Sequence, residues 1–399
     1  MGQAVSIVTL KRFNYLPDCE QAKLLLDELS QQSIPDPRRH VDRPLILYGA
    51  GNLGRMAKQY FERIGIPIDA VVDKQAEQYR RDDFWTNTEI FHPDEVDINR
   101  RQQVLLAVCV ANICYSELEQ ALVENGWHDV VHFYDIAEAY RDRHPLSNGW
   151  FCDELRQDDC ESIYQVMQCW DDNASRAYHL QFIAWRHLRQ DWLFSEAPMM
   201  TENRYLIPEV KSVLHDHEVF VDIGGHHGET SQLLLEAVDF NYEQLWLFEP
   251  DLSNLNQLKS RLAALTNLDN NKIHLDNHAL GSKKSVSQFF DGAGYASQIT
   301  MIGNKQVDVV PFDSLDIPVS FMKLHLEGTE LDALQGAKHA LLRYRPIVAM
   351  TSYHNQLGLY EMAQWLMETL SGYRFIYRMH SGCGTGAVIY AIPNERYCH

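Results

Sequence analysis

Short apolar runs alternate with helical patterns in the first part of the chain, from residue 43 onward. Residues 45–48, 70–72 and 104–110 are apolar runs of strand length, and residues 117–124 have helical spacing, as do the residues after the first run. Alternating strands and helices are typical of βαβ units, whose strands form a parallel sheet. We therefore expect a Rossmann-like sheet here.

Two other segments have a helical pattern that no predicted strand interrupts. Residues 19–31 place several leucines on one side of a predicted helix. Between about residues 140 and 203, tryptophan, histidine, glutamine and arginine occur at helical spacing, most clearly in residues 177–188. We predict a packing helix for the first segment and a helical bridge or lid for the second.

Strand and helix patterns alternate again from residue 219 to residue 344, and a strand at 347–350 and a helix at 361–370 follow. The last two apolar runs flank the glycine-rich residues 381–386, which is typical of an antiparallel hairpin. The predicted fold class is α/β, with two Rossmann-like doubly wound sheets in tandem and a closing antiparallel hairpin in the second. The predicted domains are a helical lead-in with a nucleotide-binding-like domain (1–145), the helical bridge or lid (146–205) and a second sheet domain (206–399).

Charge and cysteine usage narrow the classes of partner and compartment. The 399-residue chain has a formal net charge of −20, whereas nucleic-acid binding needs lysine and arginine against phosphates, so we exclude nucleic acid as a partner. The eight cysteines form no C-x-x-C pair, so neither a zinc site nor a disulfide framework is predicted. No stretch reaches the roughly 18 apolar residues that span a bilayer, and no signal-peptide pattern is present. We expect a cytoplasmic protein without a membrane span.

A first glycine turn, residues 49–54, follows the first predicted strand and opens a helix. Gly49, Gly51 and Gly54 permit a tight turn and close approach of a phosphate to the helix, and Asp73 at the end of the next strand can bind a ribose hydroxyl. NAD or another nucleotide is the ligand that this pattern favours. A nucleotide fold that binds nothing is an equal alternative, because the domain has no catalytic partner domain of its own.

A second glycine turn, residues 224–228, follows another strand, which ends at Asp222 and Ile223. Gly224, Gly225 and Gly228 let the backbone approach a ligand, and Glu249 after the next strand can accept two ribose hydroxyls. The carboxylate of Asp222 favours a cationic ligand without a pyrophosphate, with a structural role in the loop as the alternative. The turn therefore fits a positively charged nucleoside.

Three ionisable residues mark a later apolar strand. Alternation along a strand sends Lys323, His325 and Glu327 to one face, near the carboxyl end where open α/β sheets bind ligands. Burying such groups is costly unless they pair or take part in chemistry. A functional cluster is therefore favoured over a purely structural ion-pair cluster.

These motifs together resemble the FkbM-type methyltransferase family over roughly residues 203–393. The matching residues are Asp222-Ile223-Gly224-Gly225, Glu249-Pro250, Asp313-Ser314-Leu315, the run from Lys323 to Glu330, the run from Leu331 to Ala337, and Tyr353-His354. His325 stands where that family usually has aspartate. The first domain resembles, more loosely, small Rossmann-like modules attached to glycan-modifying enzymes.

The resemblance implies a class I methyltransferase fold and an enzyme that uses S-adenosylmethionine, bound by the second glycine turn and Glu249. It implies O-methylation of a hydroxyl on a sugar, glycan or other secondary metabolite, so the expected partner is a small-molecule or glycan acceptor. The expected catalytic residues are Glu327, His325 and His354, each able to take the hydroxyl proton. We expect His226 and His227 to pack over the ligand.

Other interpretations remain open at the level of the sequence. His325, Glu327 and His354 form a conceivable metal set, but their separation along the chain argues against it, and we expect no metal. A non-catalytic nucleotide-binding or scaffold protein is the main alternative function, and an NAD-dependent oxidoreductase that uses the first glycine turn is a weaker one. The sequence predicts no oligomeric state.

Overall fold

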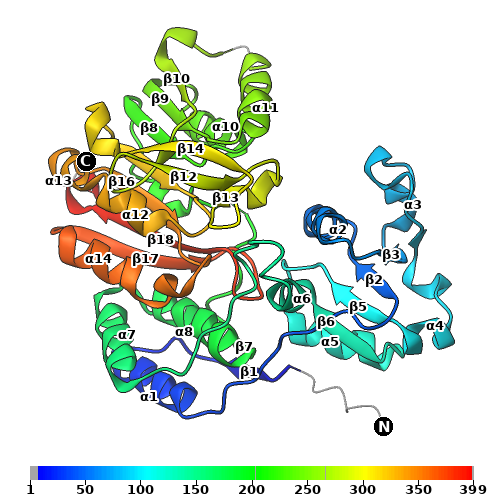
Figure 1. Ribbon diagram of the computed structural model, residues 1–399. Coiled ribbons are helices and arrows are strands. Elements are labelled where there is room, and N and C mark those ends of the chain that lie inside the picture. Colours follow the sequence, from blue (N-terminus) through cyan, green and yellow to red (C-terminus); the bar gives the residue numbers. More distant parts are fainter. Residues whose placement is uncertain (1–7, 203, 266, 398–399) are drawn as a thin grey trace.

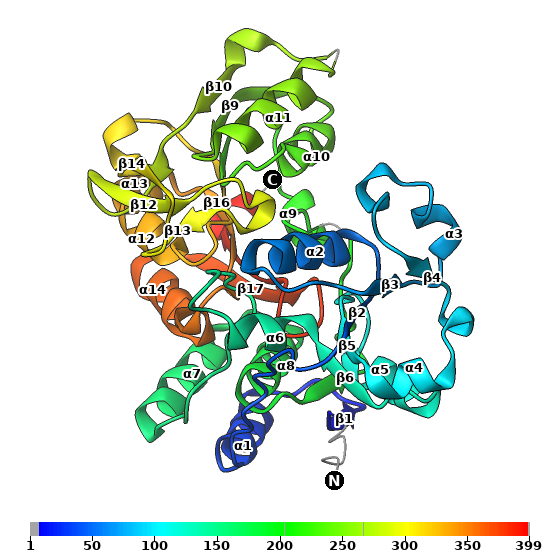
Figure 2. The same cartoon turned by 45° about the vertical axis from the view of Figure 1, so that its right-hand side comes forward.

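The computed structural model describes residues 8–202, 204–265 and 267–397, in a mixed α/β fold with parallel sheets (Figure 1). Figure 2 shows an N-terminal module in blue and cyan beside the C-terminal sheet, with helices of the bridging region beneath that sheet. Within the described residues, none of the helices combines the length and the apolar character needed to cross a membrane. The fold has three neighbouring regions: the N-terminal module, the bridging region and the C-terminal sheet with its helices.

The N-terminal module is a five-stranded parallel sheet in the order β4-β3-β2-β5-β6. Its strands are β2 (Leu45–Tyr48), β3 (Ala70–Val72), β4 (Ile90–Phe91), β5 (Leu105–Val108) and β6 (Asp129–His132). Its helices are α2 (Asn52–Ile64), α3 (Ala76–Tyr79), α4 (Ile98–Gln103), α5 (Tyr115–Glu124) and α6 (Phe133–Ala139). Separate apolar clusters cover the two faces of the sheet, which explains why β2 and β5 are continuous apolar runs.

The bridging region combines α1 (Cys19–Ser30), α7 (Gln157–Cys169) and α8 (Asn173–Leu188). Helix α1 packs on α7 and α8, and all three share an apolar core with the C-terminal sheet. The expectation that residues 140–203 contain no strand is wrong, because β7 (Asp191–Phe194) pairs in parallel with β1 (Leu10–Phe13). Each strand has only four residues, and its partner lies far away along the chain, so neither has a local signal.

The C-terminal sheet has seven strands in the order β10-β9-β8-β15-β16-β18-β17. They are β8 (Glu218–Ile223), β9 (Tyr242–Phe248), β10 (Ile273–Asp276), β15 (Phe321–Leu324), β16 (Ile347–Thr351), β17 (Tyr373–Met379) and β18 (Ala387–Pro393). Strand β18 is antiparallel to both of its neighbours, and the other pairings are parallel. The chain leaves β8 toward β9 on one side and returns as β15 on the other, so a crevice forms where their carboxyl ends meet.

Helices cover both faces of this sheet. Alternate residues of β8 point to opposite cores: Val219 and Val221 contact the core shared with α8, whereas Phe220 contacts the core on the other face. The covering helices are α9 (Pro208–Lys211), α10 (Glu229–Ala237), α11 (Leu252–Ala263), α12 (Glu330–Gln335), α13 (Lys338–Tyr344) and α14 (Glu361–Thr369). The first three lie against one core and the last three against the other.

A four-stranded sheet in the order β11-β14-β12-β13 is inserted between β10 and β15. Its strands are β11 (Ala279–Leu280), β12 (Ser285–Phe290), β13 (Gln298–Ile299) and β14 (Lys305–Val310). A short turn between β12 and β13, Gly294–Ala296, reaches back toward the second glycine turn and toward α2. This insertion forms one wall of the cavity described next.

Candidate functional site

A cavity of about 360 Å³ lies at the carboxyl ends of β8 and β15. The second glycine turn and Glu249 line it together with His325 and Glu327. Its wall also includes Thr201, Arg204, Tyr205, Asn254, Tyr295, Gln298 and Lys323. The structure therefore brings two separately predicted groups of residues to one space, of a size usual for small-molecule sites.

The second glycine turn depends on left-handed backbone conformations. Gly224 has φ of +77°, and a Cβ atom there would lie 2.0 Å from the carbonyl oxygen of His325. Glycine is thus required for β8 and β15 to approach each other at the cavity. Gly225 lines the cavity, whereas Gly228 (φ +84°) begins α10 and packs against Leu258.

Asp222 lies under the cavity and does not line it. Its carboxylate is fully buried, accepts a hydrogen bond from Ser231, and pairs with the Lys323 ammonium at 2.8 Å. Lys323 also donates to the carbonyl oxygen of Gly224 at 2.6 Å. Asp222 therefore holds Lys323 and the turn in place, and its carboxylate already has a cationic partner within the chain.

Glu249 is a buried acid on the cavity wall, with 5% of its surface exposed. Its two oxygens accept the backbone N–H groups of His226 at 2.8 Å and Asp251 at 2.9 Å. Burial raises the pKa of Glu249 to about 7. A carboxylate has about four lone-pair positions, so the Glu249 carboxylate can accept further hydrogen bonds from a ligand.

The side chains of His226 and His227, within the second glycine turn, stack on each other. The two rings lie 3.6 Å apart, and Tyr295 of the inserted sheet stacks on His226 at 3.9 Å. His226 lines the cavity, and His227 contacts the Asn254 side chain at 3.2 Å. These rings hold the insertion against the turn.

The strand alternation predicted for Lys323, His325 and Glu327 ends early. Strand β15 stops at Leu324, and Glu327 has φ of +54° within a turn that continues through Gly328. A turn, rather than strand alternation, therefore places the Glu327 carboxylate beside His325. The two side chains still meet, with 3.2 Å between His325 Nε2 and Glu327 Oε1.

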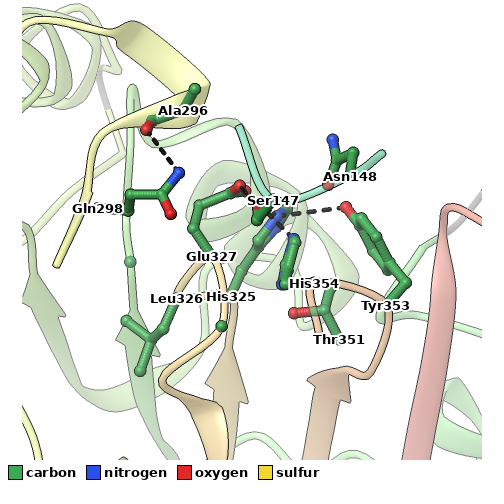
Figure 3. A network of polar contacts seen from close by, with 12 residues as sticks. Ser147, Asn148, Ala296, Gln298, His325, Leu326, Glu327, Thr351, Tyr353 and His354 are labelled. Atoms are coloured by element: carbon green, nitrogen blue, oxygen red, sulfur yellow. Dashed lines mark hydrogen bonds and ion pairs between the residues drawn. The ribbon is translucent and has the colours of Figure 1, made fainter. Parts of the chain in front are cut away.

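His354 reaches the same carboxylate from the end of the neighbouring strand, β16. Its Nε2 atom lies 3.2 Å from Glu327 Oε1, and its Nδ1 atom lies 2.6 Å from Glu330 Oε1. The Ser147 hydroxyl donates to Glu327 Oε2 at 2.6 Å, so the segment before the bridging helices also contacts the cluster (Figure 3). His325, Glu327, His354 and Ser147 thus form one network, although His354 itself does not line the cavity.

Burial and charge shift the pKa values in this network in opposite directions. Burial lowers the pKa of His325 to about 4. Burial opposes the charged forms of Glu327 and His354, but the attraction between their charges outweighs it. The pKa of Glu327 is therefore lowered and that of His354 is raised.

Several residues of the site had no signal in the sequence. The Tyr205 hydroxyl lies 2.9 Å from His325 Nδ1, and Tyr205 and Ser147 both belong to the segment predicted only as a helical bridge or lid, 146–205. Tyr295 belongs to the short turn Gly294–Ala296 of the inserted sheet, whose longer strands β12 and β14 are partly exposed. Only the packing of distant segments brings these residues to the cavity.

The predicted nucleotide residues of the first module serve the packing of their own turn. The carboxylate of Asp73 accepts the backbone N–H groups of Ala50 and Gln75, each at 2.7 Å. A Cβ atom at Gly54 would lie 2.0 Å from the carbonyl oxygen of Gly49, whereas one at Gly51 would meet only the Tyr79 hydroxyl at 3.7 Å. A nucleotide at this turn stays a prediction.

Residues 222–377 match the family model described as Methyltransferase FkbM domain. This match covers the second glycine turn and the cluster around Glu327, and it confirms the resemblance predicted from the motifs. Among the curated proteins, no match was found.

A solved structure extends the similarity to most of the chain. The crystal structure of Methyltransferase FkbM from Methylobacillus flagellatus KT has a TM-score of 0.59 at 18% identity, covering 94% of this chain and 99% of that one. An rRNA methylase from Streptococcus thermophilus has a TM-score of 0.33 at 10% identity, covering 49% of this chain and 98% of that one. At this identity, the first comparison shows a shared fold that includes the N-terminal part.

Proposed function

We propose that the chain is an S-adenosylmethionine-dependent O-methyltransferase that acts on a hydroxyl of a sugar, glycan or other secondary metabolite. One observation carries the proposal: a single cavity joins the second glycine turn and Glu249 to His325 and Glu327. The first group suits a nucleoside and the second offers proton acceptors. A methyl donor and a hydroxyl acceptor fit side by side in this arrangement.

The residues at the nucleoside end suit S-adenosylmethionine. Glu249 lines the cavity, is nearly buried and keeps lone pairs for two ribose hydroxyls. Gly224 and Gly225 line the wall beside it, and a Cβ atom at either position would crowd His325 or Leu258. When bound, this cofactor supplies a methyl group on a cationic sulfur.

The residues at the other end suit an acceptor hydroxyl. Glu327 and His325 face the cavity with a carboxylate oxygen and an imidazole nitrogen, either of which can take a hydroxyl proton. Ser147 fixes Glu327 by donating to its other oxygen. The site therefore orients the nucleophile, and holding the reacting atoms about 3 Å apart provides most of the rate enhancement.

Calorimetric titration with S-adenosylhomocysteine tests the nucleoside end. We expect binding by the full chain and a loss of affinity of at least about tenfold, or 1.4 kcal/mol, in Glu249→Gln. Glu243→Gln is the matched control, because Glu243 lies on the same strand, β9, but is exposed. Equal affinity in Glu249→Gln and Glu243→Gln, or no binding by folded protein, would contradict the proposal.

The acceptor end is tested with methyl-labelled S-adenosylmethionine and a panel of saccharides and hydroxylated metabolites. We expect transfer of label to a hydroxyl oxygen and loss of turnover in Glu327→Gln, with S-adenosylhomocysteine affinity unchanged. Turnover equal to that of the unmodified chain in Glu327→Gln would remove this residue from catalysis. Titration with NAD on the same sample tests the first glycine turn separately.

A further inference from the structure

We propose that His325 Nε2, His354 Nε2 and Glu327 Oε1 form a binding site for a divalent transition-metal ion. The three ligand atoms lie within 4.8 Å of one another at the acceptor end of the cavity. Separation along the chain argued against a metal, but β15 and β16 are neighbours, so residues at their ends meet in space. The metal site stands on its own geometry and does not depend on the proposed methyl transfer.

The distances match those between ligands of one ion. Each histidine Nε2 lies 3.2 Å from the same oxygen of Glu327. With metal–ligand bonds of about 2.1 Å, two ligands at that separation subtend an angle of about 100° at the metal. This angle lies between those of octahedral and tetrahedral coordination.

His354 is oriented as a ligand by a buried carboxylate. Its Nδ1 atom contacts Glu330 Oε1 at 2.6 Å, and Glu330, which is fully buried, also accepts the Thr351 hydroxyl and the Leu326 N–H. With the proton on Nδ1, the Nε2 lone pair points toward Glu327. This pattern of carboxylate, histidine and open nitrogen is usual around metal ions in proteins.

The facing atoms of His354 and Glu327 form a buried contact that a cation can occupy. His354 Nε2 is buried and makes no hydrogen bond to any described residue, although Glu327 Oε1 is only 3.2 Å away. Without a metal ion, a proton on His354 Nε2 fills this contact, and a metal ion would take the place of that proton. A cation there satisfies both atoms and the His325 nitrogen together.

The other two ligands are also held by neighbours. The Tyr205 hydroxyl lies 2.9 Å from His325 Nδ1, and His325 Nε2 lies 3.2 Å from Glu327 Oε1 and 3.4 Å from the Tyr353 hydroxyl. Ser147 donates to Glu327 Oε2 and leaves Oε1 for the ion (Figure 3). Every proposed ligand therefore has a partner that fixes its orientation.

Ligand type favours a particular class of ion. Two imidazoles and one carboxylate suit Zn²⁺, Fe²⁺ or Mn²⁺ better than Mg²⁺ or Ca²⁺, which prefer oxygen. His325 and Glu327 line the cavity, so further coordination positions face the space for the acceptor. If the proposed function holds, the bound cation would lower the pKa of an acceptor hydroxyl by stabilising the alkoxide, and His325 and Glu327 would then act as ligands in place of proton acceptors.

A second group of potential ligands provides the internal comparison. His226, His227 and Glu229 also lie within 4.8 Å of one another. Glu229, however, pairs with the Arg261 guanidinium at 2.8 Å, and the two imidazoles stack on each other. A cation beside Arg261 is disfavoured by charge, so this group is the control.

The experiment titrates the chelator-treated 399-residue chain with Zn²⁺, Mn²⁺ and Mg²⁺, and follows Co²⁺ binding by its visible absorption. We expect one equivalent of Zn²⁺ or Co²⁺, with Mn²⁺ weaker and Mg²⁺ weakest. Glu327→Gln and His325→Gln should lose affinity by about 100-fold or more, and His227→Gln should retain it. Circular dichroism melting confirms that each variant is folded, and the Co²⁺ spectrum of the unmodified chain tests the site without any variant.

Two outcomes overturn the site. One is the absence of stoichiometric Zn²⁺ or Co²⁺ binding by folded protein. The other is binding that persists in Glu327→Gln and His325→Gln, or that is lost in His227→Gln. Titration of the same samples with S-adenosylhomocysteine separates the two proposals. If the protein binds S-adenosylhomocysteine but no metal ion, only the metal site is overturned. If it binds a metal ion but no S-adenosylhomocysteine, only the cofactor pocket is overturned.

Discussion

Two opposing demands act on Glu249. Its position on the cavity wall suits hydrogen bonds from a ribose, which favour the carboxylate, whereas burial raises its pKa to about 7 and favours the neutral acid. Ligand binding must therefore displace a proton when the pH is below that value. The pH dependence of affinity reports directly on this residue.

We expect the affinity for S-adenosylhomocysteine to be constant above about pH 8 and to fall by up to about tenfold per pH unit below pH 7. The sign follows from the raised pKa, because lowering the pH fills the protonated state, which accepts the hydroxyls less well. Calorimetric titration between pH 5.5 and 8.5 measures the slope. In Glu249→Gln the affinity for S-adenosylhomocysteine should be lower and independent of pH. A pH dependence retained in that variant would assign the proton to another group.

Local motifs made some residues of the site predictable. Gly224 and Glu249 could be identified because a strand, a turn and a helix follow one another within a short stretch. Ser147 and Tyr205 contact the same network from 180 and 120 residues away along the chain. Contacts of that kind depend on how whole segments pack, which no local pattern encodes.

At the scale of the elements, the first glycine turn contains one glycine that packing requires and one that it does not. Gly54 in α2 packs against the backbone of Gly49, and a Cβ atom there would lie 2.0 Å from a carbonyl oxygen. Gly51 precedes the same helix with open space around it. One glycine is therefore required by the fold of the module and the other is not.

We expect Gly54→Ser to destabilise the module by about 1–3 kcal/mol, because the added atoms force the turn and the helix apart. Gly51→Ser is the matched control and should be neutral or slightly stabilising, since serine caps helix N-termini well. Urea unfolding midpoints of the two variants measure the difference. Equal midpoints would show that the close contact at Gly54 is not what selects glycine there.

The burial of each strand explains which elements the sequence could predict. The central strands of both large sheets are mainly apolar and buried, since helices cover both faces of each sheet. Strands β1 and β7 and the inserted four-stranded sheet are short or half exposed, and their pairing is not local. Hydrophobic pattern alone cannot identify strands whose burial depends on a distant partner.

At the scale of the whole molecule, the bridging helices and the C-terminal sheet share one core. Phe182 of α8 and Tyr377 of β17 belong to the same apolar cluster, and their rings lie 6.2 Å apart. Arg186, fully buried in α8, donates to the carbonyl oxygens of Asn148, Trp150, Tyr353 and Gly384. These contacts connect the bridge, the end of β16 and the loop before β18.

We expect a fragment of residues 206–399, the domain predicted from the sequence, not to fold by itself. Without α8, the face of β17 that contacts Phe182 becomes exposed, at a cost of roughly 2 kcal/mol or more for each large apolar side chain. The carbonyl groups of Tyr353 and Gly384, beside the network of His354, also lose their buried donor. Thermal melting followed by circular dichroism should show no cooperative transition for this fragment, and mixing it with residues 1–205 should restore one together with S-adenosylhomocysteine binding. A cooperative melt of the isolated fragment would instead show that the C-terminal sheet folds without the bridging helices. The contacts of Arg186 and Ser147 would then orient residues of the site but would not be needed for the fold that forms it.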